Sequence, residues 1–269
     1  MCAEFWKRSL LLLALAAASM SLSVSAGAQE VADKPADPVY LEEPVPGPEP
    51  TVTREGRDNA SKYDNGQVRI DRQIRQLSDN QIVNHGEFIE YYRSGEKFAE
   101  GRFEDGIHQG AWKYWYDNGQ LAKDVIFKNG QPDGSWDAFR ADGTLLSKKN
   151  YREGKREGAW AYYHGDGKTP RVEQSYKDGK LDGPMTTYHA NGKAWQKIAF
   201  AAGQPTGVAE EFDPSGRKQI ESRFQDGKLH GTRTRWNVDG TVTVQEFADG
   251  KPAGRATTTA APAEAPPSE

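Results

Sequence analysis

Residues 110–133 read GAWKYWYDNGQLAKDVIFKNGQPD, and a pattern of this kind recurs along most of the chain. Each copy opens with a glycine, has a second glycine nine residues later and has a third glycine near its end. The opening glycines are Gly86, Gly110, Gly134, Gly158, Gly183, Gly207 and Gly231, and Gly254 closes the array. A nearly constant period of 23 to 25 residues indicates a tandem array of seven units.

The residues that precede the later glycines of each unit indicate tight turns. Asn118 precedes Gly119 at the second position, and Asp105 precedes Gly106 at the third. Such dipeptides provide the positive φ angles that hairpin turns require at little steric cost. The stretches between turns are about six to nine residues long, which suits strands and is too short for stable helices. Each unit is therefore predicted to form a strand, a turn, a second strand and a second turn.

Two columns of aromatic residues run in register with the glycines and are predicted to form the repeating core. The first column is Tyr91, Trp115, Phe139, Tyr163, Tyr188, Phe212 and Trp236, and the second is Phe103, Phe127, Tyr151, Tyr176, Phe200, Phe224 and Phe247. Neighbouring strands lie about 4.8 Å apart, so equivalent rings of successive units should stack at intervals of roughly 10 Å. The predicted fold class is all-β: an elongated, single-layer antiparallel β-meander of tandem hairpin repeats of about 24 residues. We expect at least fourteen strands between residues 63 and 254.

The segments that flank the array are expected to lie outside this fold. Residues 1–28 have the layout of a secretory signal peptide, because Lys7 and Arg8 precede an apolar stretch and Ala26 and Ala28 mark a cleavage site. An uncleaved membrane anchor is the alternative, and the serines that interrupt the apolar stretch argue against it. Residues 29–60 are expected to be a proline-rich disordered linker, residues 61–85 a degenerate capping repeat, residues 86–254 the seven repeats, and residues 255–269 a disordered tail.

Charge and cysteine content exclude several classes of protein. The formal net charge of −4 lacks the positive excess of nucleic-acid binders, so no nucleic-acid partner is expected. The single cysteine, Cys2, excludes an internal disulfide framework and a cysteine-based metal site. Because Cys2 lies in the predicted signal peptide, the mature chain would contain neither a cysteine nor a transmembrane segment. This suits an extracytoplasmic location, in the periplasm or secreted from a bacterium.

The sequence carries none of the residue patterns that indicate an enzyme or a metal site. It contains no GxSxG, HExxH or Walker A pattern. Among the five histidines, only His164 and His189 occupy equivalent positions. At roughly 10 Å apart they would be too distant to share a metal, and we expect them to face solvent. The nine-residue period of a calcium-binding roll is absent, so we expect no catalytic residue, no cofactor and no metal.

A further aromatic column is the candidate binding site. Two residues after the opening glycine, the first four units carry a large ring, whereas the later units carry Met185, Ala209 and Arg233. Together with tyrosines of the same strand parity, these rings form a ladder of Phe88, Trp112, Tyr114, Trp136, Trp160 and Tyr162. The ladder either covers the second face of a single-layer sheet or lines a groove that stacks sugar rings or anchors an extended peptide.

The units at residues 110–133 and 158–182 resemble MORN repeats, in the variant found in bacterial proteins described as YwqK-family antitoxins. The resemblance covers about residues 63–254 and implies an elongated antiparallel β-meander that serves as a binding scaffold. We therefore expect an exported, non-enzymatic repeat scaffold that binds another macromolecule, in the first place a protein of the cell envelope. The alternatives are a glycan-binding module that uses the aromatic ladder, with a polysaccharide as partner, and a toxin-neutralising, immunity-like protein.

Overall fold

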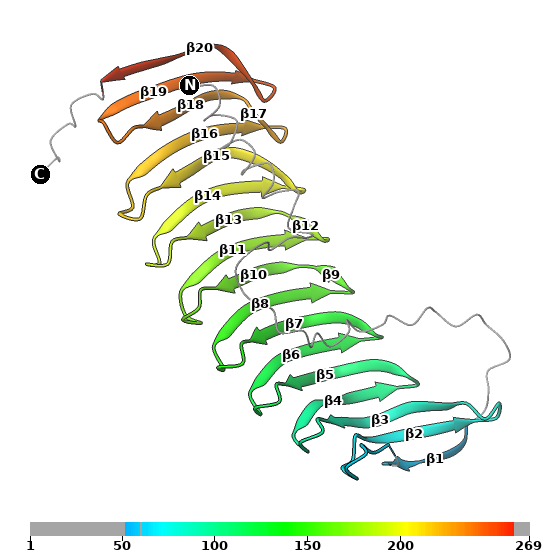
Figure 1. The fold of residues 1–269 in the computed structure, drawn as a ribbon. Helices are drawn as coiled ribbons and strands as arrows, with labels where there is room; N and C mark the ends of the chain where they lie inside the picture. The colour runs from blue at the N-terminus through cyan, green and yellow to red at the C-terminus, as the bar shows by residue number, and fades with distance from the viewer. Residues whose placement is uncertain (1–51, 60, 261–269) are drawn as a thin grey trace, which may run out of the picture.

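The structure is a computed structural model that describes residues 52–59 and 61–260. Within these residues the chain forms strands and turns but no helix, and all the strands belong to one antiparallel sheet. Figure 1 shows the strands side by side in chain order, from β1 at one end of a long, arched sheet to β20 at the other. The predicted all-β, single-layer antiparallel meander is therefore confirmed. No helix of the described part of the chain could span a membrane.

The sheet contains 20 strands. Those of the first half are β1 (Val52–Asp58), β2 (Ile70–Leu77), β3 (Ile82–Tyr91), β4 (Lys97–Glu104), β5 (Ile107–Trp115), β6 (Leu121–Lys128), β7 (Gln131–Phe139), β8 (Leu145–Arg152), β9 (Lys155–Arg156) and β10 (Gly158–Tyr163). Those of the second half are β11 (Pro170–Lys177), β12 (Lys180–Leu181), β13 (Gly183–Tyr188), β14 (Ala194–Ala201), β15 (Gln204–Phe212), β16 (Lys218–Gln225), β17 (Lys228–Leu229), β18 (Gly231–Trp236), β19 (Thr241–Ala248) and β20 (Lys251–Ala260).

Three of these strands are two-residue pieces that belong with the strand that follows them. β9 and β10 both pair with β8, β12 and β13 both pair with β11, and β17 and β18 both pair with β16. Each interruption precedes an opening glycine with positive φ, such as Gly158 at 65°. When each piece is counted with its neighbour, 17 of the 20 strands remain as successive rungs of the sheet.

The two kinds of turn use their glycines differently. At the third glycine column both residues of the dipeptide have positive φ, as at Asp105 (47°) and Gly106 (84°). At the second column only the glycine does, as at Gly119 with φ of 78°. There the side chain of Asn118 instead accepts a hydrogen bond from the amide of Gln120 at 3.0 Å. The asparagine thus stabilises this turn through its side chain and not through a left-handed backbone.

The ladder and the second aromatic column lie on the same face of the sheet, which we call the aromatic face. Cross-strand pairs share a face, and Trp112 pairs with Val125 two residues before Phe127. One of the two interpretations of the sequence placed the ladder on a second face of the sheet. The strand pairing contradicts that interpretation. Buried side chains of the aromatic face include Phe103, Trp112, Val125, Phe127, Trp160, Tyr176, Met185, Phe200 and Phe247.

The first aromatic column, from Tyr91 to Trp236, is not part of the buried core, and that prediction is wrong. Its residues stand at strand ends beside the turns, as Trp115 does at the end of β5, so few neighbours cover them. Trp236 is exposed. Lysine side chains lie over some of these rings, as Lys97 does over Trp115 with its ammonium nitrogen 5.7 Å from the ring centroid.

The sheet extends beyond the predicted array at both ends. β1 lies in the segment expected to be a disordered linker, and it pairs with β2 with the help of an ion pair between Arg57 and Asp71 at 2.7 Å. β20 runs to Ala260, within the expected disordered tail, because the turn at Asp249 repeats the geometry of earlier units and threonines follow it. The predicted signal peptide and most of the linker lie outside the described residues.

Candidate binding surface

Rings from neighbouring strands pack against one another along the aromatic face in T-shaped or tilted arrangements. Phe103 and Trp112 have their ring centroids 4.9 Å apart, and Trp160 and Tyr176 are likewise 4.9 Å apart. His108 bridges the units, with centroids 4.3 Å from Trp112 and 5.1 Å from Phe127. The continuous run comprises Phe88, Phe103, Trp112, His108, Phe127, Trp136, Tyr151, Trp160 and Tyr176. The ladder is thus interleaved with the second column as one packed stack.

The two best-packed indoles of the ladder are fixed in place. Trp112 is 2 % exposed and Trp160 is 5 % exposed. The Nε1–H of Trp112 donates to the carbonyl of Arg102 at 3.1 Å, and that of Trp160 donates to the carbonyl of Asn150 at 2.8 Å. The remaining ladder residues, Phe88, Tyr114, Trp136 and Tyr162, are partly buried. Stacking on a sugar requires an exposed ring face, which Trp112 and Trp160 do not offer.

In the central part of the aromatic face, between β5 and β11, three cations lie over aromatic rings. The ammonium nitrogen of Lys149 is 5.3 Å from the ring centroids of both Trp160 and Tyr162. Lys123 lies 5.9 Å from the ring centroid of Tyr114, and Arg156 lies 4.6 Å from that of Tyr176. Burial, and secondarily the charge of Lys123, lower the pKa of Lys149 from its ordinary value. The rings compensate only part of the lost hydration of these cations.

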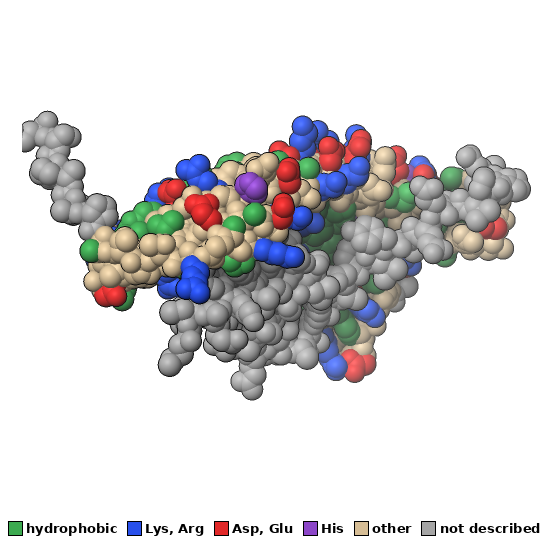
Figure 2. Space-filling model, turned by 90° about the horizontal axis from the view of Figure 1, so that it is seen from above, with side chains coloured by type: hydrophobic (Ala, Val, Ile, Leu, Met, Phe, Trp, Pro, Cys, Tyr) green, Lys and Arg blue, Asp and Glu red, His purple; other side chains and the backbone are tan. Residues whose placement is uncertain are grey.

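The opposite face is organised by charge, and we call it the charged face. Its central row consists of Glu100, Lys113, Asp124, Asp137, Lys148, Glu173, Lys197, Glu210 and Glu221. Lys113 pairs across strands with Asp124, and Lys148 with Asp137. Lys218, beside the row, forms ion pairs with Glu210 at 2.5 Å and Glu221 at 2.9 Å. The visible surface in Figure 2 likewise shows basic and acidic side chains close to one another.

Towards the C-terminal end the aromatic face becomes polar. Arg233 takes the position of the ladder tryptophans and is 3 % exposed. Burial lowers the pKa of Arg233, and the negative charge of Glu211 offsets part of this decrease. Burial raises the pKa of Glu211, and the positive charges of Arg233 and Arg235 offset part of this increase. Here a basic and an acidic residue share the face. This arrangement differs from the central part, where the cations lie among rings.

Side chains at the turns form hydrogen bonds with the backbone of the next unit. The hydroxyl of Tyr116 donates to the carbonyl of Phe139 at 2.9 Å, one unit further along the chain. His164 and His189 use the same position, and the Nε2 of His189 donates to the carbonyl of Phe212 at 2.9 Å. The two histidines are partly buried, so the expectation that they face solvent is wrong. Their hydrogen bonds to the next unit are the reason.

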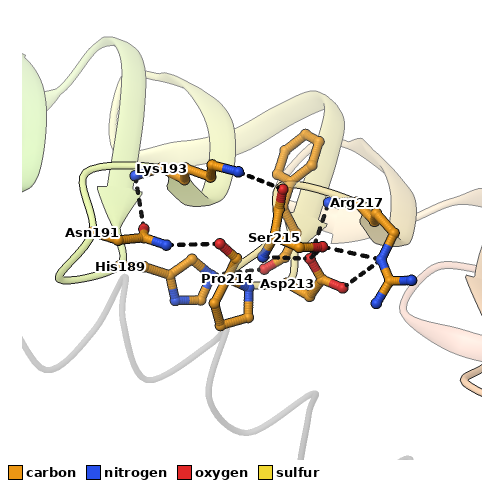
Figure 3. Close-up of polar contacts among 8 residues, drawn as sticks. His189, Asn191, Lys193, Asp213, Pro214, Ser215 and Arg217 are labelled. Carbon is orange, nitrogen blue, oxygen red and sulfur yellow. Dashed lines mark hydrogen bonds and ion pairs between the residues drawn. The ribbon is translucent and has the colours of Figure 1, made fainter.

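Figure 3 shows this connection around His189. The amide of Asn191 donates to the carbonyl of Pro214 at 2.7 Å, and the ammonium of Lys193 donates to the carbonyl of Ser215, also at 2.7 Å. Residues of one turn therefore satisfy backbone acceptors of the following turn. Within the described residues, no group of three or more histidine, cysteine or acidic side chains could hold a metal.

The comparisons with known proteins agree with the repeat architecture. Residues 109–129 match the family model of the MORN repeat variant. No match was found among functionally curated proteins. The matched residues cover most of β5 and β6 with the turn between them, and the same register of glycines and rings recurs in the neighbouring units. The chain thus carries the MORN repeat variant, in the unit built from β5 and β6.

Proposed function

We propose that the protein is an exported, non-enzymatic scaffold that binds another protein of the cell envelope. The observation that carries this proposal is the open sheet itself, in which 17 successive strands present two chemically different faces. One face is aromatic with scattered cations, and the other carries a row of acidic and basic side chains. Such a surface is suited to contact over an extended area, as repeat scaffolds use it.

The chemistry of the described residues supports a binding role over catalysis. A cavity of about 200 Å³ lies beside the N-terminal end of the sheet, and it is lined by Asn59, Gln67, Val68, Asp71, Tyr91 and Gly95. This lining combines one carboxylate with amides and a phenol, and it provides no paired acid and base or activated nucleophile. The export part of the proposal rests on the sequence of residues 1–28.

A protein partner is favoured over a glycan by the packing of the ladder. Carbohydrate stacking needs flat ring faces that are open to the ligand. Trp112 and Trp160 are buried and hydrogen-bonded, so their rings support the sheet. A protein interface does not require those ring faces to be open, since half-buried side chains and charges also contribute to it.

The binding proposal is tested by affinity capture on the immobilised, processed protein from envelope extract, with free protein added as competitor. We expect one protein, or a few, to be retained and then displaced by the competitor, and mass spectrometry identifies them. Polysaccharide retained in place of protein would favour the glycan alternative. If the scaffold itself is found in the cytoplasm and retains a toxin-like protein of the cytoplasm, the toxin-neutralising alternative is favoured. Turnover of a small molecule by the purified chain would contradict a non-enzymatic role.

The export proposal is tested separately by fractionation and N-terminal sequencing. We expect the mature chain to begin at Gln29 and to appear in the periplasmic or secreted fraction. A control with Leu11, Leu12 and Leu13 changed to Asp should stay in the cytoplasm unprocessed, because the apolar stretch would be lost. A wild-type chain that retains Met1 and stays in the cytoplasm would contradict export.

A further inference from the structure

The three cations in the central part of the aromatic face differ from Lys113 and Lys148 on the charged face in what surrounds them. Lys123, Lys149 and Arg156 contact rings, and none of them forms an ion pair with any residue that the structure describes. Lys113 and Lys148 on the charged face stand directly opposite carboxylates. Lys123, Lys149 and Arg156 are partly buried. Lysine and arginine that lose hydration are usually paired with an anion, and among the described residues this arrangement has none.

The central part of the aromatic face carries no acidic side chain that could supply this counter-charge. The cross-strand pairs on this face between β5 and β11 include Tyr114 with Lys123, Trp136 with Lys149 and Tyr151 with Arg156. None of the residues paired on this face in these described strands is acidic. On the same face, Glu90 and Glu211 stand only towards the two ends of the sheet, in β3 and β15.

The spacing of the cations suits an extended chain that crosses the strands. Lys123 on β6 and Lys149 on β8 are two strands apart, which corresponds to about 10 Å across the sheet. They are offset by two residues along the strands, since the row of Lys123 continues to Ser147. Arg156 on β9 lies on the next strand after Lys149 and pairs with Tyr151. An extended peptide covers about 10 Å in three residues, so carboxylates spaced two to three residues apart could reach successive cations. Apolar side chains between them would lie on the half-buried rings of Trp136 and Tyr162.

We propose that this part of the aromatic face, centred on Lys123, Lys149 and Arg156, docks an extended acidic segment of a partner protein. The inference rests on the proposed scaffold function and specifies the chemistry of the partner. Carboxylates of the segment replace the missing counter-charge, and the rings exclude water around the ion pairs. Because the charges lie in a partly desolvated strip, each new ion pair contributes more than it would on an open surface.

The test uses a random 12-residue peptide library displayed on phage and selected against the processed wild-type protein. We expect enrichment of peptides with at least two acidic residues, spaced two or three positions apart, among apolar residues. A triple variant, K123Q/K149Q/R156Q, should weaken binding of the best synthetic peptide at least tenfold. The charge-keeping variant K123R/K149R/R156K should retain most of the affinity. Circular dichroism and the melting midpoint verify that each variant is folded.

A matched variant of the opposite face gives the control. K113Q/K148Q/K197Q removes the same number of cations from the charged face and should leave peptide affinity unchanged. Wild-type affinity should also fall as salt is raised, since the contact is partly electrostatic. Enrichment of peptides without acidic residues, or equal affinity of K123Q/K149Q/R156Q and K113Q/K148Q/K197Q for the peptide, would overturn the proposal.

Other occupants of this surface are separate outcomes of the same experiment. Residues 29–50 of the chain itself contain six acidic residues and one lysine. If acidic peptides bind only after these six residues are changed to their amides, the chain's own segment is the occupant and the proposal is wrong. Binding of polygalacturonate with no enriched peptide would also overturn it, in favour of a carboxylated glycan. If K123Q/K149Q/R156Q still captures a specific protein from envelope extract as the wild type does, that result would support the scaffold function. It would contradict only the proposal that this surface binds the partner.

Discussion

Gly101 illustrates how single residues set the packing of the aromatic face. It lies at a bulge between β4 and β5, where the pairing shifts between Glu100 and Arg102. A β-carbon at this position would lie 2.2 Å from the indole ring of Trp112. The glycine has no positive φ, so the close approach of the ring is what excludes a side chain. The equivalent position in the next unit holds Val125, which is fully buried.

We expect Gly101→Ala to destabilise the protein by about 1–3 kcal/mol, because the added methyl group overpacks the contact with Trp112. Urea unfolding followed by circular dichroism measures the loss. In a Trp112→Leu background the same substitution should cost much less, since the ring is gone. An equal loss in both backgrounds would show that the strain does not come from the ring.

Asp166 provides a prediction about pH. Hydrogen bonds from the Thr169 hydroxyl and from the amides of Lys168 and Thr169 lower its pKa from 3.8 to about 2. Its stabilising contribution is therefore complete above the unfolded value near 3.8 and is lost as the pH falls through about 2. Asp166→Asn should show a smaller decrease in unfolding free energy between pH 5 and pH 2 than the wild type. Thr169→Val should reduce the difference, and identical pH profiles for wild type and Asp166→Asn would contradict the assignment.

At the scale of strands and hairpins, each unit is stabilised chiefly by its neighbours. The rings stack across successive strands, and turn side chains such as Tyr116 and His189 donate to carbonyls of the following unit. A unit in the middle has such contacts on both sides, whereas the unit that holds β19 has only β20 beyond it among the described strands. Stability should therefore vary along the array as in other linear repeats.

Phe127 and Phe247 test this dependence on position, because both are 3 % exposed and occupy equivalent places. Phe127→Ala should lower the global free energy of unfolding by about 3–5 kcal/mol. Phe247→Ala should mainly release the terminal strands, with faster amide hydrogen exchange confined to β18–β20 and a smaller change in the global midpoint. Equal global losses, with exchange accelerated along the whole sheet, would count against a linear stack.

At the scale of the whole molecule, the open sheet predicts a long separation between equivalent residues of distant units. Arg102 on β4 and Arg223 on β16 are exposed and occupy equivalent positions five units apart. Ten strand spacings separate them, which gives about 48 Å before curvature shortens the chord.

Spin labels on cysteines introduced at these two positions, with Cys2 changed to Ser, measure that separation by electron paramagnetic resonance. We expect a distance of about 40–50 Å. A matched pair at Arg102 and Ile126, in adjacent units, should give a short distance and controls for label mobility. A distance under about 30 Å between the outer positions would indicate that the sheet folds back on itself, contrary to a single open layer.

The residues of the array predict its local geometry, because turns and strand lengths are set by neighbouring positions. The glycine columns and their Asn or Asp partners predict the hairpins, and the third-column turns have the expected positive φ at both residues. Seven repeats of one hairpin then require an antiparallel meander. The assignment of rings to faces could not be predicted, because bulges such as that between Tyr114 and Trp115 shift strand parity.

Only the assembled sheet decides what each side chain meets on the neighbouring strand. Strand pairing interleaves the ladder with the second aromatic column and places Lys149 between Trp160 and Tyr162. The sequence predicts that His189 faces solvent, whereas in the assembled sheet its imidazole donates a hydrogen bond to the carbonyl of Phe212 in the next unit. The sequence by itself determined the repeat, its turns and its all-β class, since these depend on residues close along the chain. The tertiary structure decided burial and counter-charge, since these depend on residues one unit apart.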